Sequence, residues 1–169
     1  MLRICPEQPT DLAAIRRVHE QAFGRAAEAD LVDIIRRGGK TVLSLVGVEG
    51  DCIVGHILFS PVTIESADRI IPAVGLAPMA VIPERQRRGI GSRLIKAALN
   101  ECRRAGHDYV VVLGHPTYYP RFGFVPASRY GIASEYAVPD EAFMVLAWRG
   151  EVWGERGGLA RYEPEFRKV

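Results

Sequence analysis

The residues best suited to chemistry in this chain lie between positions 84 and 93, where arginines and glycines cluster. These ten residues hold four arginines and one glutamate, so their net charge of +3 exceeds the +2 of the whole 169-residue chain. Gly89 and Gly91 allow the backbone to approach a ligand and leave its amide hydrogens available. A helix that begins here would add unpaired amides and a partial positive charge at its first turn. The segment is therefore suited to binding phosphate oxygens.

Two common nucleotide-binding motifs do not fit this segment. Leu94 stands where the dinucleotide fingerprint G-x-G-x-x-G needs its third glycine, and the arginines are foreign to that motif. The sequence also lacks G-x-x-x-x-G-K-[ST], the usual loop for ATP and GTP. An isolated G-x-G can equally form a tight turn beside solvated arginines, but its position between a strand and a helix favours a phosphate site.

A strand before this loop and a helix after it must hold it in place. Residues 70–82 form a long apolar run that two prolines and a glycine interrupt, which predicts a bulged or splayed strand. Apolar residues then recur at helical spacing from Ile90, and Gly106 stands where a glycine ends a helix. Residues 109–113 are nearly all apolar, as in a strand buried on both faces. This order suggests a right-handed crossover between parallel strands.

The remaining elements follow from periodicity and from glycine and proline breaks. They are a short strand around Ile4, helices over 12–23 and 29–37, an antiparallel hairpin of 41–48 with 52–60 that Pro61 closes, and a strand over 143–148. Residues 150–169 hold four glycines among mixed charges and are expected to be a weakly structured extension, which Trp153, Tyr162 and Phe166 could still dock.

Two motifs resemble the GNAT superfamily of acetyl-coenzyme A-dependent N-acetyltransferases. Residues 86–91, Gln-Arg-Arg-Gly-Ile-Gly, resemble its Q/R-x-x-G-x-G/A signature, and residues 119–124, Tyr-Pro-Arg-Phe-Gly-Phe, resemble its Y-x-x-x-G-F element. The resemblance covers residues 1–149 as one domain and leaves 150–169 as a C-terminal extension. It implies an α/β (α+β) fold with a mixed, mostly antiparallel sheet, splayed central strands and flanking helices.

The resemblance also implies a cofactor and the residues that hold it. Acetyl-CoA would insert its pantetheine arm beside the long fourth strand, as an added strand would, and the loop amides would hold its pyrophosphate. The implied cofactor-binding residues are Met79, Ala80, Val81, Gln86, Arg87, Arg88, Gly89, Ile90, Gly91 and Ser92. The implied reaction is direct attack by a primary amine of an unidentified small molecule or protein, in a ternary complex. The alternative is a non-catalytic module of the same fold that binds or senses acyl-CoA.

By position, Tyr119 matches the superfamily's general acid, which would protonate the departing thiolate; its alternative is packing onto the core. The base is open, because many members carry a glutamate on the fourth strand and residues 76–79 (Leu-Ala-Pro-Met) hold no acid. A water relay, an amine that arrives deprotonated, or His115 could replace it. Glu28 could line the acceptor pocket or be an exposed glutamate at a helix start. His19, His56 and His107 show no metal-ligand spacing, and no metal is expected.

Composition limits which partners, which cysteine-based sites and which cellular compartment are expected for this protein. A net charge of +2 argues against nucleic acid or a membrane surface as partner. Three cysteines at long spacings, Cys5, Cys52 and Cys102, indicate neither a disulfide framework nor a zinc site. With no apolar run of signal-peptide or membrane-spanning length, the sequence predicts a cytoplasmic protein. A homodimer is left open.

Overall fold

A computed structural model of the protein describes residues 1–149, 153 and 157–169. Three α-helices are described: α1 (Leu12–Phe23), α2 (Ala27–Arg37) and α3 (Ile90–Arg104). The described strands are β1 (Leu2–Pro6), β2 (Leu43–Glu49), β3 (Cys52–Glu65), β4 (Ile70–Val81), β5 (Tyr109–Leu113), β6 (Val125–Pro126), β7 (Ile132–Ser134), β8 (Phe143–Ala147) and β9 (Gly158–Tyr162).

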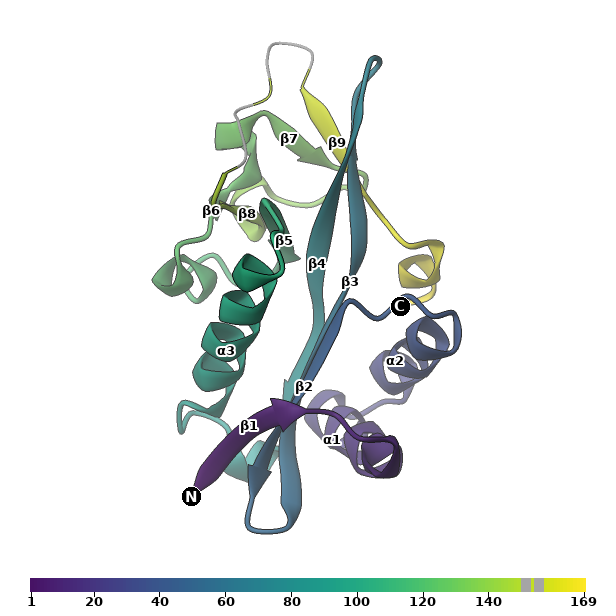
Figure 1. The fold of residues 1–169 in the computed structure, drawn as a ribbon, viewed down its shortest axis with the longest axis vertical. Coiled ribbons are helices and arrows are strands. Elements are labelled where there is room, and N and C mark those ends of the chain that lie inside the picture. The colour runs from purple at the N-terminus through teal and green to yellow at the C-terminus, as the bar shows by residue number, and fades with distance from the viewer. Residues whose placement is uncertain (150–152, 154–156) are drawn as a thin grey trace. The chain divides into compact units, whose positions relative to one another are not determined.

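These strands form one mixed sheet that is mostly antiparallel, as predicted (Figure 1). The order is β1-β2-β3-β4-β5-β8-β6, with β9 paired to β3 and β7. The predicted helix over 12–23 and strand over 109–113 match α1 and β5 at both ends. The predicted parallel relation across α3 is confirmed by the register of β4 and β5, which pairs Val74 with Val110 and Gly75 with Val111.

The chain divides into two compact units. The first contains residues 1–60, 77–102 and 164–169, and the second contains residues 61–76 and 103–163. Both β3 and β4 contribute residues to each unit.

In the first unit, helices cover both faces of the strands. The core below α1 and α2 is built from Ile15, Leu31, Val32, Ile35, Val46, Val48 and Leu58. Because side chains alternate along β2, Gly47 faces the other way, and a Cβ there would lie 3.5 Å from Ile90 of α3. A Cβ on Gly55 of β3 would lie 2.9 Å from Leu94, so glycine allows α3 to pack closely. Figure 1 shows α3 on the opposite side of these strands from α1 and α2.

In the second unit, the core lies around β5 and β8, which pair antiparallel from Tyr109 with Ala147 to Leu113 with Phe143. The core also includes Trp153, which is 4% exposed, and Ala160 of β9, which is fully buried.

One sequence prediction about where a strand ends is wrong. Pro61 does not end its strand, because β3 continues to Glu65. Pairing of β3 with β2 ends at Phe59 and pairing with β9 begins at Val62, so the missing proline N–H falls between the two ladders.

The weakly structured extension predicted after residue 149 is also wrong for residues 158–168, which form β9 and a short 3-10 helix, η6 (Pro164–Lys168). Trp153 docks onto the second unit's core and Phe166 onto the first unit's core, as predicted. Gly150 and Gly154, two of the glycines behind that prediction, lie outside the described residues.

The cysteines are free thiols in three environments: Cys52 is exposed, Cys5 is half-buried and Cys102 is buried. Within the described ranges, no helix is both long enough and apolar enough to cross a membrane.

Candidate active site

The predicted phosphate loop joins β4 to α3 within the first unit. After β4, a short 3-10 helix, η2 (Pro83–Arg85), leads into the loop. The Gln86 side chain donates from Nε2 to the carbonyl of Val81 over 2.9 Å, which ties the loop back to the end of β4. The Arg93 amide donates to the Gly89 carbonyl over 3.0 Å. The amides of Ile90 and Gly91 precede this bond and lie in the first turn, where helix geometry provides no acceptor.

Two loop residues have left-handed backbones, Arg87 with φ 61° and Gly89 with φ 82°. A Cβ on Gly89 would meet no atom within 4 Å, so its backbone angle and not its surroundings requires glycine. Arg87 holds the same conformation with a side chain, at a cost of roughly 1–2 kcal/mol. Residues held in such conformations concentrate at ligand-binding sites.

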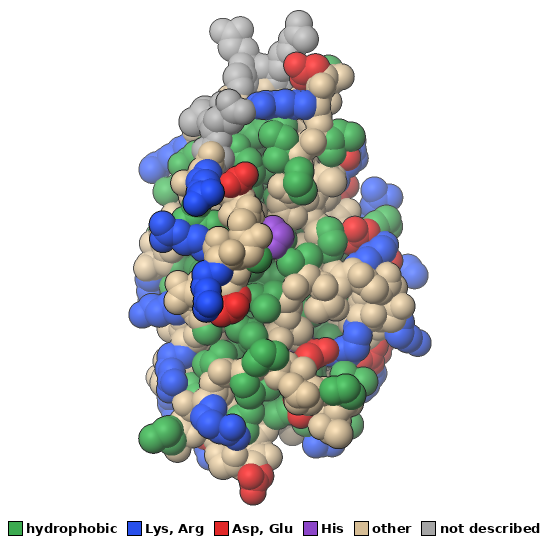
Figure 2. Space-filling model, viewed as in Figure 1, with side chains coloured by type: hydrophobic (Ala, Val, Ile, Leu, Met, Phe, Trp, Pro, Cys, Tyr) green, Lys and Arg blue, Asp and Glu red, His purple; other side chains and the backbone are tan. Residues whose placement is uncertain are grey.

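The four arginines of this segment divide into two pairs. Arg85 forms an ion pair with Glu49 at 2.8 Å, and Arg93 donates to the Leu2 carbonyl over 3.0 Å. Arg87 and Arg88 are exposed, and no ion pair or hydrogen bond engages their side chains within the described part of the chain. Figure 2 shows Lys and Arg dispersed over the drawn face, with Asp and Glu between them. The charge available to a phosphate at the loop is therefore that of Arg87 and Arg88.

The segment predicted to pair with pantetheine also lies in the first unit. Ala80 is buried, while Met79 and Val81 are half-buried. Just beyond it, Ile82 N–H donates to the Val54 carbonyl over 2.9 Å, which aligns this part of β4 with β3.

Tyr119 lies in the second unit, in the short 3-10 helix η3 (Tyr119–Phe122). Its side chain is 9% exposed and packs edge-on against Tyr118 and Phe124, with ring centroids 5.2 and 5.7 Å away. A Cβ on Gly114 would overlap the Tyr119 ring, so only glycine fits there. Burial, together with Tyr118, raises the pKa of Tyr119 to about 12. The phenol therefore stays protonated at neutral pH, as an acid must.

The two other candidate residues differ in their surroundings. His115 is exposed, and its carbonyl accepts the Tyr118 amide at 3.1 Å. Glu28 is not the exposed helix-start glutamate weighed above, because it is only 5% exposed. Its carboxylate accepts hydrogen bonds of 3.0 and 3.1 Å from Arg25 Nε.

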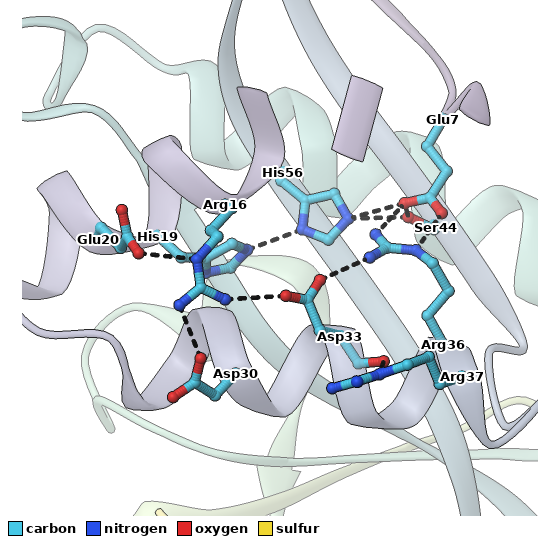
Figure 3. A network of polar contacts seen from close by, with 10 residues as sticks. All are labelled: Glu7, Arg16, His19, Glu20, Asp30, Asp33, Arg36, Arg37, Ser44 and His56. Carbon is cyan, nitrogen blue, oxygen red and sulfur yellow. Dashed lines mark hydrogen bonds and ion pairs between the residues drawn. The ribbon is translucent and has the colours of Figure 1, made fainter. Parts of the chain in front are cut away.

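A polar network with a buried centre lies in the first unit, and no sequence pattern predicted it (Figure 3). Its members are Glu7, Arg16, His19, Glu20, Asp30, Asp33, Arg36, Arg37, Ser44 and His56. At its centre His19 Nε2 lies 2.8 Å from His56 Nδ1, and both side chains are fully buried. Two histidines within the apolar stripes of a helix and a strand were the available signal, but their contact spans 37 residues of sequence.

The chain is similar to several known proteins that are named acetyltransferases. The model of the acetyltransferase (GNAT) domain matches residues 3–127. The uncharacterized N-acetyltransferase YjhQ of Escherichia coli K12 is 42% identical over 136 residues, which cover 78% of this chain and 75% of YjhQ. The uncharacterized N-acetyltransferase YhbS of the same strain is 30% identical over 163 residues, 96% of each chain.

Two solved structures are similar over nearly the whole chain. Escherichia coli YhbS in complex with CoA has a TM-score of 0.89 and 29% identity, covering 98% of this chain and 92% of that one. A GNAT family acetyltransferase from Brucella melitensis in complex with acetyl-CoA has a TM-score of 0.81 and 34% identity, covering 98% of both chains.

Proposed function

The chain belongs to the GNAT acetyltransferase family, and we propose that it transfers the acetyl group of acetyl-CoA to a primary amine of a small molecule or a protein. The observation that carries this proposal is the loop of residues 86–92, with its left-handed residues, first-turn amides and two unengaged arginines. The CoA and acetyl-CoA complexes of the two similar structures support the same cofactor here.

In this proposal the loop and β4 share the cofactor. The amides of residues 87–92 hold the pyrophosphate, and the guanidinium groups of Arg87 and Arg88 add positive charge. The backbone of residues 79–81 pairs with the pantetheine amides. Acetyl-CoA supplies the thioester carbonyl that the acceptor amine attacks.

Tyr119 is proposed to protonate the departing thiolate. Because its pKa is raised to about 12, its hydroxyl keeps its proton at every pH at which the protein would be assayed. The raised pKa makes it a weak acid towards a solvated thiolate. Tyr119 therefore contributes most if the thiolate forms away from water, because desolvation raises the basicity of the thiolate.

A second candidate function is a module that binds acyl-CoA without catalysis. Residues 76–79 lack the carboxylate that many GNAT enzymes use as base, which favours this alternative. It predicts CoA binding with no acetyl transfer.

The first test compares two glycines. Gly89 and Gly106 both have left-handed backbones, with φ 82° and 88°, and neither has an atom within 4 Å of an added Cβ. Alanine at either position is expected to cost about 1 kcal/mol of stability. CoA at 100 times its dissociation constant should stabilise the wild type and Gly106→Ala by about 2.7 kcal/mol. The Gly89→Ala variant should lose most of this gain, because its methyl group occupies the proposed phosphate approach.

The measurement is thermal unfolding with and without CoA, followed by a thiol-release screen with acetyl-CoA over polyamines, amino acids, aminoglycosides and peptide N-termini. An unchanged melting curve at saturating CoA would contradict cofactor binding. A CoA shift without thiol release from any acceptor would favour the non-catalytic module.

A further inference from the structure

A cavity of about 670 Å³ opens in the first unit and shares no residue with the proposed cofactor site. Its lining comes from β1, from α1, from β2 and β3 near the turn that joins them, and from Ile82, which follows β4. Figure 1 shows β1 and α1 near this end of the β2–β3 hairpin. A volume of several hundred Å³ is typical of sites for small organic ligands.

The floor of the cavity is apolar and belongs to the sheet. Val46 and Val48 of β2 are 1% and 9% exposed and belong to the core below α1 and α2. Cys5 and Ile53 also line the cavity and pack against the same core. An apolar group that entered the cavity would therefore leave water for contact with apolar side chains, which is favourable.

One wall places an arginine beside this floor. The register of β1 and β2 puts Arg3 directly opposite Val48, and residues paired in this way project their side chains from the same face of a sheet. Because Val48 faces α1 and α2, the side chain of Arg3 leaves the sheet on the side of the cavity. Arg3 is exposed, and no ion pair or hydrogen bond engages its guanidinium within the described residues.

Another wall is one face of α1. Its residues recur at spacings of three and four, as neighbours on a helix face do: Ala14, Arg17, Val18 and Gln21. The preceding arginine, Arg16, lies outside the lining and forms ion pairs of 2.9, 2.7 and 2.8 Å with three carboxylates. Arg17 is exposed and has no such partner in the part of the chain that the structure describes.

Two carboxylates also line the cavity. Asp11 is engaged, because its Oδ2 accepts the Gln8 amide at 2.7 Å. Asp51 lies in the exposed turn between β2 and β3, and no described residue bonds to its side chain. The groups that remain to meet a ligand are therefore two guanidinium groups and one carboxylate, so the surplus charge is positive.

We propose that this cavity is a second ligand site, which binds a small amphipathic anion: a carboxylate or phosphate group carried by a short apolar chain. Arg3 and Arg17 donate hydrogen bonds to the anionic oxygens, which the planar guanidinium fork matches well. The apolar chain packs on the floor. The site goes beyond the proposed acetyl transfer, because it holds none of the residues assigned to the cofactor or to Tyr119's step.

The test is isothermal titration calorimetry of the full chain with sodium hexanoate and with hexyl phosphate. Hexylamine, which has the same chain and the opposite charge, is the control ligand. Millimolar affinity is expected of anions with so few atoms, and binding of either one supports the site and identifies its charged group. Hexanoate should bind about fourfold more tightly than pentanoate, because it buries one more methylene group.

Two variants locate the bound anion. Arg17→Gln should raise its dissociation constant about tenfold, because a charge-assisted hydrogen bond is lost. Arg37→Gln is the matched control, since Arg37 is an exposed helical arginine of the same unit outside the cavity. Ala14→Leu fills the cavity without a change of charge and should weaken binding at least as much. Ala13→Leu adds the same side chain at an exposed position of the same helix and should not.

Thermal unfolding without ligand shows whether each variant folds, and Arg17 is exposed, so its variant keeps the test open if Ala14→Leu does not fold. The site would be overturned by equal binding of hexylamine, by anion binding that neither Arg17→Gln nor Ala14→Leu weakens, or by no saturable binding at tens of millimolar. None of these measurements uses acetyl-CoA. Failure of the cavity would therefore leave the proposed acetyl transfer standing, and the reverse also holds.

Discussion

Tyr119 combines a buried ring with a hydroxyl that stays protonated, and this combination makes its role measurable. We expect Tyr119→Phe to lower kcat by about 10- to 100-fold, because general acid catalysis contributes at least this much. KM for acetyl-CoA should change little, since the ring and its contacts with Tyr118 and Phe124 remain. Steady-state kinetics by thiol release would measure both constants.

The same residue predicts a pH dependence. With the pKa of Tyr119 raised to about 12, loss of its proton should not reduce kcat of the wild type below about pH 11. A basic decline near pH 10 that Tyr119→Phe abolishes would show an unburied, ionising phenol and contradict this role. Tyr118→Phe is the matched control.

Single residues of the loop could be predicted from sequence only where their role is local. Gly89 follows from the motif, and its φ of 82° bears out the need for glycine. The partners of Arg85 and Arg93 are 36 and 91 positions away, so no spacing rule could separate them from Arg87 and Arg88. For the same reason the burial of Glu28 was not predictable, because exposure depends on how neighbouring elements pack.

At the scale of elements, β9 is expected to be essential. A chain that ends at residue 157 loses β9 and η6, whereas one that ends at residue 163 loses η6 alone. Removing β9 takes the buried Ala160 from the second unit's core and leaves residues 62–65 of β3 without that partner. We expect the shorter chain to aggregate or to melt roughly 10 °C below the longer one, which corresponds to several kcal/mol.

Differential scanning calorimetry of the two truncated chains and the full chain would measure this effect. Equal melting temperatures for both truncations would mean that β9 adds nothing beyond η6, and that residues 150–169 are the dispensable extension which their composition suggests.

Elements whose own apolar residues follow a clear helix or strand pattern were predictable from sequence. Elements that depend on pairing with a distant strand were not. Helix α1 and strand β5 carry complete local patterns and match at both ends. By contrast, β9 is a glycine-flanked strand that pairs with β3 about a hundred residues earlier, as in Val62 with Tyr162. The continuation of β3 through Pro61 depends on the same pairing.

At the scale of the whole molecule, the histidine pair predicts acid sensitivity. The pKa of His19 is near 3 in the folded chain and near 6.5 in the unfolded chain. Between these values the unfolded chain binds the extra proton, so stability is complete above pH 6.5 and is lost as pH falls. His19 alone should cost about 1.4 kcal/mol per pH unit in this window. The lowered pKa of His56 acts in the same direction.

Urea unfolding at several pH values from 8 to 4.5 would measure this slope. His19→Gln should flatten it, whereas His107→Gln should leave it unchanged. A free energy of unfolding that stays constant between pH 7 and 5 would contradict the burial of neutral histidines. Below about pH 4.5 a further loss is expected. Burial alone would raise the pKa of Glu7, but hydrogen bonds from His56, Arg36 and Ser44 lower it below its usual range.

The exposure of the cysteines has a practical consequence for every assay that detects coenzyme A through its thiol. Cys52 is exposed, so each molecule of enzyme brings at least one sulfhydryl that a colorimetric disulfide reagent will titrate together with the product. The same thiol can form a mixed disulfide with CoA on storage. Burial raises the pKa of Cys102 to about 12, so its thiol stays protonated and does not react with the reagent. Cys52→Ser gives a lower blank and is the better starting protein for slow acceptors, where a few micromolar of background would hide turnover.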